Sequence, residues 1–196
     1  MNLIERVKNI ILTPKTEWAK IAIEEQTLTT VITSYVVPLV LIGAAATFIG
    51  YGLIGINYGF FRMSGIEWGI KMAVIQVLSA LIGVIVTAFI VDALAPSFGS
   101  EKNMNKSAQL VAYGYTPALI GAIFNIFPAI ALIGSLFSLY GIYLMYLGLE
   151  PIKKTPEDKK VIYLVVTIVA LIVVYVVIGI ILGSILGTRL ATTTLG

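Results

Sequence analysis

Tyr113-Gly114-Tyr115-Thr116-Pro117 is the stretch around which the rest of the chain is organised. It places aromatic residues, a glycine and a proline inside a segment whose flanks are apolar enough for a membrane-spanning helix. Pro117 cannot donate a hydrogen bond to the carbonyl of Tyr113, and in hydrocarbon a freed carbonyl needs another donor. The Thr116 hydroxyl can supply one. We therefore expect a spanning helix that is broken here and shielded from lipid by its neighbours.

The composition places the chain in a bilayer. Its 196 residues are 59% hydrophobic and only 12% charged, with a mean hydropathy of +1.00, whereas soluble domains carry about 25% charged residues. Without Cys or His, the chain lacks thiolate nucleophiles, histidine acid/base pairs and soft metal ligands. We expect no catalytic residues, no cofactor, no metal site and no enzymatic activity. The cations are scattered through short loops, which favours a topological role over a nucleic-acid partner.

Five apolar runs are long enough to cross a hydrocarbon core of about 30 Å. We therefore predict an all-α integral membrane five-helix bundle. Pro38 is expected to kink the first span, the turn 125–128 to set the fourth span antiparallel to the third, and Pro151 to end the fourth helix. Gly179, Gly183 and Gly187 lie four residues apart and predict close helix packing. The five spans are 28–55, 70–94, 108–124, 129–149 and 161–187.

The first 26 residues predict two amphipathic helices at the membrane interface. Glu5 and Lys8 interrupt the apolar residues there, so the segment does not match a signal peptide. Thr13 and Pro14 are a good N-cap and first helical residue, and they begin a second helix that carries Trp18. We expect the apolar faces to lie on lipid, with Trp18 at headgroup depth. A membrane anchor is favoured over a docking surface for a cytosolic partner.

The cations predict the orientation of the chain. Ten lie on the N-terminal side of the five spans and three on the other, so the positive-inside rule places the N-terminus in the cytoplasm. We expect cytoplasmic interfacial helices (1–26), a five-span domain (27–187) and a short extracytoplasmic tail (188–196) in a cell membrane. The ten are Arg6, Lys8, Lys15, Lys20, Lys102, Lys106, Lys153, Lys154, Lys159 and Lys160, and the three are Arg62, Lys71 and Arg189.

Asp92 is the one acidic residue within the predicted spans that is a candidate for a functional role. Pro96 and Gly99 follow closely, so it lies near a helix end. An acid at that position is either a proton or cation ligand or a group wetted by lipid headgroups. The position near the end favours the second interpretation, and the first stays open.

Three motifs carry a resemblance to a known family. They are Thr13-Pro14-Lys15 followed by Trp18, the third-span sequence Leu-Val-Ala-Tyr-Gly-Tyr-Thr-Pro (110–117), and Tyr146-Leu147-Gly148-Leu149. Together with five spans they resemble the Ypt-interacting (Yip) domain family over nearly the whole chain. In eukaryotes, the resemblance implies early secretory traffic and binding of Rab-type GTPases through a cytosolic N-terminal region. The chain has a short N-terminal arm and lacks the Asp-Leu-x-Gly-Pro signature of the eukaryotic members. In these two features it resembles a prokaryotic-type member.

Two functions follow as hypotheses. The first is a non-catalytic protein that organises membrane or recruits partners, namely membrane lipids, with a protein at the cytoplasmic face and a homo-oligomer as further options. The second is a small-solute or ion transporter or channel in which Asp92 and the broken third helix form the site. The scarcity of charge within the spans, and the lack of an inverted repeat in an odd number of spans, favour the first.

Overall fold

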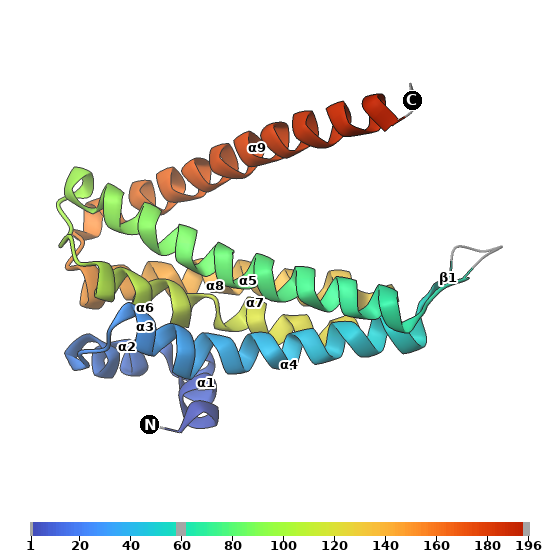
Figure 1. The fold of residues 1–196 in the computed structure, drawn as a ribbon. Coiled ribbons are helices and arrows are strands. Elements are labelled where there is room, and N and C mark those ends of the chain that lie inside the picture. Colours follow the sequence, from blue (N-terminus) through green and yellow to red (C-terminus); the bar gives the residue numbers. More distant parts are fainter. Residues whose placement is uncertain (1, 58–61, 194–196) are drawn as a thin grey trace.

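The molecule is a bundle of long helices with two short helices laid against one end (Figure 1). The computed structural model describes residues 2–57 and 62–193, with side chains at 2–56, 63–174, 176 and 177. A two-residue ladder, in which Ile56 pairs with Met63, joins the first two long helices. The elements are α1 (Leu3–Leu12), α2 (Pro14–Ile23), α3 (Leu28–Val31), α4 (Val37–Phe48), β1 (Ile56–Asn57), β2 (Arg62–Met63), α5 (Ile66–Leu94), α6 (Met104–Gly114), α7 (Thr116–Gly121), α8 (Ala131–Lys153) and α9 (Lys160–Thr193).

Within the described residues, three helical segments are long and apolar enough to cross a membrane: Leu28–Ile54, Ile66–Phe98 and Pro128–Lys153. They agree with the first, second and fourth predicted spans. The predicted third span is not one continuous helix, because α6 ends at Gly114 and α7 begins at Thr116. The predicted fifth span lies within α9. The chain therefore has the character of a membrane protein.

The predicted antiparallel pairing of the third and fourth spans is confirmed. Gly121 of α7 and Gly134 of α8 face each other so closely that a methyl group on either would collide with the other's carbonyl. Further along, a Cβ on Gly141 would lie 2.7 Å from the carbonyl oxygen of Gly114. Such distances are open only to glycine, so small residues set how close these two helices approach.

Two predicted helix ends were wrong. Pro151 does not end the fourth helix, because α8 continues to Lys153. Ile152 and Lys153 are both buried, so the contacts of the last turn outweigh the one backbone hydrogen bond that proline removes. The last helix continues to Thr193 rather than ending at Gly187, so the expected tail is largely helical. The packing predicted for Gly179, Gly183 and Gly187 lies outside the described side chains.

The helical turns before Pro38 are widened, and the predicted kink of the first span stays a prediction. The segment Ile32–Val36 directly before it forms wide, π-type helical turns that lead into α4. Proline lacks the N–H that a regular turn would use, and a wider turn accommodates that loss without breaking the helix.

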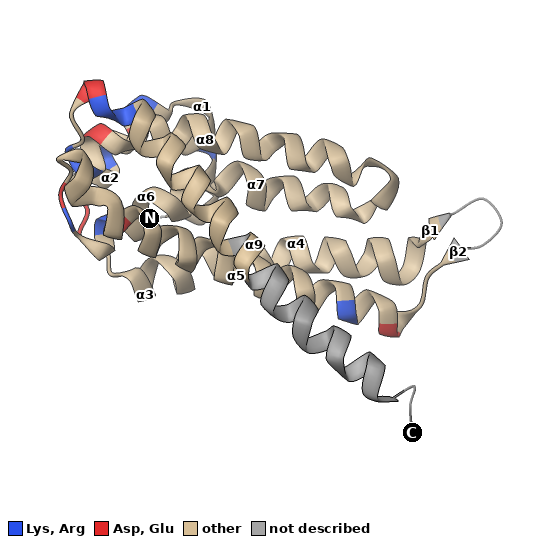
Figure 2. Ribbon diagram, turned by 90° about the horizontal axis from the view of Figure 1, so that it is seen from above, with Lys and Arg blue, Asp and Glu red and all other residues tan. Residues whose placement is uncertain are grey.

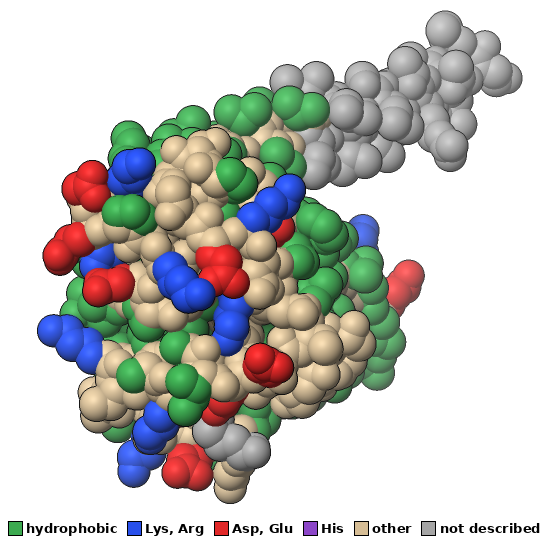
Figure 3. All heavy atoms as spheres, turned by 90° about the vertical axis from the view of Figure 1, so that its left-hand side faces the viewer, with side chains coloured by type: hydrophobic (Ala, Val, Ile, Leu, Met, Phe, Trp, Pro, Cys, Tyr) green, Lys and Arg blue, Asp and Glu red, His purple; other side chains and the backbone are tan. Residues whose placement is uncertain are grey.

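Charged residues gather at one end of the bundle (Figure 2), where α1, α2, α3 and α6 lie. Seen end-on, this face mixes cations and carboxylates with apolar groups (Figure 3). We call it the charged end. Trp18, Leu110 and Leu144 are fully buried and belong to one apolar cluster.

Candidate functional site

The N-terminal helices pack on protein rather than lying free on lipid. Trp18 is fully buried, and its indole occupies the space left by Gly148 of α8, where a Cβ would come within 2.8 Å of the ring. The Tyr113 ring meets it edge-on, with the centroids 6.3 Å apart. The expectation that the apolar face carrying Trp18 lies on lipid was wrong, whereas its depth relative to the headgroups stays a prediction. Helical spacing identifies an apolar face, but it does not say whether that face meets lipid or another helix.

A buried ion cluster fastens these two helices together. Arg6 of α1 donates from Nη1 to Oε1 of Glu17 in α2 at 2.8 Å, and both side chains are 1% exposed. Its Nη2 pairs with Glu24, which follows α2. The guanidinium also lies 5.2 Å from the centre of the Tyr113 ring, a cation–π distance. Because opposite charges surround Arg6, the charge is buried with partners.

The link between α2 and α3 is held by α6. Lys106 donates to the carbonyls of Ala22 at 2.7 Å and Glu24 at 2.9 Å, and Gln109 donates to the Glu24 carbonyl at 3.0 Å. The Tyr113 hydroxyl donates to Gln26 at 3.0 Å. The helix that the sequence marked as polar therefore uses its polar groups to bind the N-terminal segment. We call residues 2–26, with these contacts, the docked arm.

The break in the third span is bridged as the sequence predicted. The Thr116 hydroxyl donates to the Tyr113 carbonyl at 2.7 Å and lies 2.6 Å from the Tyr35 hydroxyl. A hydroxyl has one proton to donate, so Tyr35 is the donor in the second bond. Tyr113, Gly114, Thr116 and Pro117 are all buried. The expected shielding of this polar helix from lipid is confirmed.

Thr116→Val tests this bridge. Valine keeps the shape but leaves the Tyr113 carbonyl and the Tyr35 hydroxyl without a partner, which we expect to cost about 1 to 3 kcal/mol of unfolding free energy. In a Pro117→Ala background the restored N–H can reach that carbonyl, so the cost should fall. Unfolding in mixed detergent measures both. The matched control is Thr33→Val, an exposed hydroxyl bonded only to backbone carbonyls. Equal losses at positions 33 and 116 would contradict the bridge.

Asp92 lies in an ion pair that the sequence did not reveal. Lys153, which is fully buried, places Nζ 3.3 Å from Asp92 Oδ1. Ser107 donates to the same oxygen at 3.0 Å and accepts from Lys153 at 2.7 Å. The triad joins α5, α6 and α8 just inside the charged end. A buried carboxylate with an ammonium and a hydroxyl beside it has the partners that it needs.

Arg6, Glu17 and Lys153 are the residues that sequence reasoning missed. Arg6 carried a signal, because it precedes Ile10 by one helical turn and therefore shares its buried face. Lys153 carried none, because it belongs to a run of cations that reads as a solvated loop. Among the residues that the structure describes, no group of three or more His, Cys, Asp or Glu side chains could hold a metal ion.

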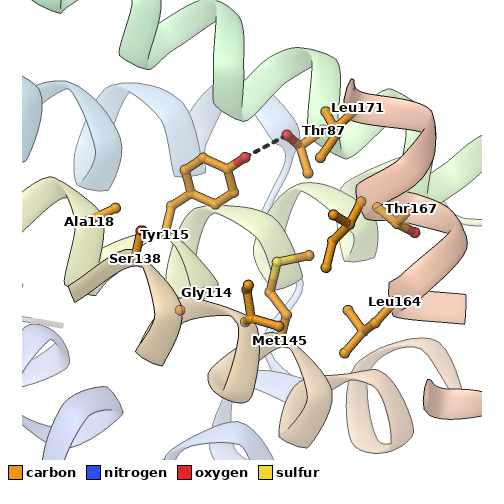
Figure 4. A pocket seen from close by; sticks show the side chains of 12 residues that line it. Thr87, Gly114, Tyr115, Ala118, Ser138, Met145, Leu164, Thr167 and Leu171 are labelled. Atoms are coloured by element: carbon orange, nitrogen blue, oxygen red, sulfur yellow. Dashed lines mark hydrogen bonds between the residues drawn. The ribbon is translucent and has the colours of Figure 1, made fainter. Parts of the chain in front are cut away.

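A cavity of about 240 Å³ lies beside the break (Figure 4). Gly114 and Tyr115 border it, together with Thr87 of α5, Met145 of α8 and Thr167 of α9. The Tyr115 hydroxyl lies 2.7 Å from that of Thr87. Asp92 is not among the lining residues, so the structure places it away from the cavity at the break, although it contacts the first half of the broken helix through Ser107 near the start of α6.

A model of the Yip1 domain matches residues 8–180. The chain belongs to the Yip1 domain family. The match begins within the docked arm and covers the helix break and the hairpin of α7 and α8, so the arm is part of this Yip1 domain rather than an appendage. Comparisons with curated proteins and with solved structures find no match.

Proposed function

We propose that the protein is a non-catalytic, five-span protein of the cell membrane that organises lipid and protein partners at its charged, cytoplasmic end. The observation that carries this proposal is the docked arm. Its buried groups are all turned inward, and its outer surface presents cations beside large apolar side chains at the end where a bilayer surface would lie. This is a built surface rather than a loose tail.

The outer surface of the arm suits an anionic membrane surface. Lys8, Lys15 and Lys20 are exposed, and Ile4, Leu12 and Ile23 are exposed by 75%, 66% and 85%. Apolar side chains that enter the headgroup region beside lysines at its edge are the pattern of interfacial helices. This pattern supports a membrane-surface anchor that places Ile4, Leu12 and Ile23, rather than Trp18, on lipid.

The paired carboxylates favour a protein without catalysis or coupled transport. Glu17 is neutralised by Arg6 and Asp92 by Lys153, and the cavity at the helix break is lined by apolar groups and hydroxyls. Proton or cation coupling needs a titratable group that faces the pathway. Because Asp92 does not line the cavity, the arrangement favours an organiser over a transporter.

Cysteine labelling tests the five-span topology. The chain has no natural Cys, so single replacements report on one site each. Glu157 is 87% exposed at the charged end, and Ser64 is exposed in the loop before α5. We expect Ser64→Cys to react with an impermeant maleimide in intact cells and Glu157→Cys only after lysis. The reverse pattern would invert the orientation, and labelling of both from one side would remove the odd number of spans.

Lipid retention tests the charged end. The protein is assembled into nanodiscs from a mixture of phosphatidylglycerol and phosphatidylcholine. The lipids that co-purify with it should contain a larger share of phosphatidylglycerol than the starting mixture. Because each surface lysine contributes about 1 kcal/mol towards anionic lipid, the combined Lys8→Gln, Lys15→Gln and Lys20→Gln variant should lose the enrichment. Lys71→Gln, at the opposite end of α5, is the control and should retain it. An unchanged enrichment in the triple variant would contradict the proposal.

A further inference from the structure

We infer that the cavity beside the helix break is a binding site for an acyl chain of a membrane lipid. The inference rests on the proposed function only in requiring that α5, α7, α8 and α9 lie in a bilayer. It does not depend on the orientation of the chain, nor on the cations of the docked arm.

The size of the cavity is the first argument. At about 240 Å³, it exceeds an engineered apolar cavity of about 150 Å³ that holds benzene. Leu164 and Leu171 of α9 face Met145 of α8 across it (Figure 4). Methionine adapts its shape to irregular neighbours, which suits a flexible hydrocarbon chain better than a rigid solute.

The hydroxyls on the wall are already used. Thr167 donates to the Tyr163 carbonyl at 2.8 Å, and Thr87 donates to the Gly83 carbonyl at 2.7 Å. Because the Thr87 proton is committed, the Tyr115 hydroxyl must be the donor in its bond to Thr87. Ser138 donates to the Ser135 carbonyl. A polar solute would find these donors already engaged, whereas an apolar chain needs none.

The position of the cavity identifies the source of the occupant. Ile142, at the midpoint of α8, is 40% exposed and also lines the cavity. Because a helix rises 1.5 Å per residue, Thr87 lies about 10 Å along the helix axis from Leu94, where α5 ends. The cavity therefore opens onto the outer surface of α8 within the depth of the apolar core. The molecules that meet an opening there are the hydrocarbon chains of lipids.

Photo-crosslinking tests this site. The full chain is reconstituted in phosphatidylcholine vesicles containing a phosphatidylcholine with a diazirine midway along one acyl chain. After irradiation, mass spectrometry should locate adducts on Met145, Ile142 and Leu171. Ala118→Phe, which fills the cavity from α7, should lower these adducts about tenfold, as expected when two or more methylene groups lose a buried position. Ile168→Phe fills the same cavity from α9, so it tests the site independently if Ala118→Phe does not fold.

The matched control is Leu132→Phe, an enlargement of a residue that is 77% exposed on the same helix as Met145. It should leave the cavity adducts unchanged. Adducts found only on outward residues such as Leu132, or an unchanged yield in both filled variants, would overturn the inference. Phosphatidylcholine has no net charge, so this result does not follow the phosphatidylglycerol enrichment. The two proposals can therefore fail separately.

Discussion

Lys153→Met is expected to lower the free energy of unfolding by about 3 to 5 kcal/mol. The lysine is fully buried, and its ammonium is the only cation within a salt-bridge distance of Asp92 among the described residues. Methionine fills a similar volume but leaves the carboxylate with Ser107 as its side-chain donor. An uncompensated buried charge costs more than a lost contact. Unfolding in mixed detergent, followed by circular dichroism, measures the loss.

The neighbouring residue supplies the control. Lys154 is 77% exposed and pairs with Glu101 at 2.7 Å, where its hydrogen bond holds the pKa of the Glu101 carboxyl below its ordinary value. An exposed pair of this kind contributes about 0 to 1 kcal/mol, so Lys154→Met should have little effect. Adding Asp92→Asn to Lys153→Met should recover much of the loss, because the unpaired charge is then gone. If Lys153→Met and Lys154→Met lowered the free energy of unfolding by similar amounts, the triad of Asp92, Ser107 and Lys153 would not contribute specially to stability.

Trp18→Ala should release the docked arm and cost about 3 to 5 kcal/mol. The indole is the largest fully buried side chain of the described residues, and it joins α2 to α8 and to Tyr113. Removing it leaves a cavity beneath the ion cluster of Arg6, Glu17 and Glu24. Hydrogen exchange of residues 3–23 should rise while the exchange of α5 stays slow, because the hairpins of the bundle do not depend on the arm.

Ile23→Ala is the matched control, since Ile23 ends the same helix and is 85% exposed. We expect a change within about 0.5 kcal/mol. Gly148→Ala probes the same contact from the other side, because its Cβ would meet the indole at 2.8 Å, and overpacking costs about 1 to 3 kcal/mol. If Trp18→Ala left the hydrogen exchange of the arm unchanged, the contacts of the Trp18 indole would not be what holds the arm on the bundle.

The features that could be read from the sequence are those set by local chemistry and by the bilayer. Apolar length located the helices Leu28–Ile54, Ile66–Phe98 and Pro128–Lys153. The missing N–H of Pro117 predicted the break, and the need to satisfy a carbonyl in an apolar surrounding predicted the role of Thr116. The Yip1 family itself was visible in short motifs. Helix ends were less well predicted, because hydropathy indicates where a helix leaves lipid and not where its helical turns end.

Hydropathy and proline chemistry were sufficient to predict the membrane class, the position of the long helices, the broken third span and its bridge. The contacts of Trp18 with Gly148 and of Lys153 with Asp92, and the separation of Asp92 from the cavity at the break, became visible in the folded chain alone. These contacts escape prediction because apolar or charged residues recur with the same helical period whether they meet lipid, water or protein. The partner of each, often many residues away in the chain, is chosen by how the helices pack.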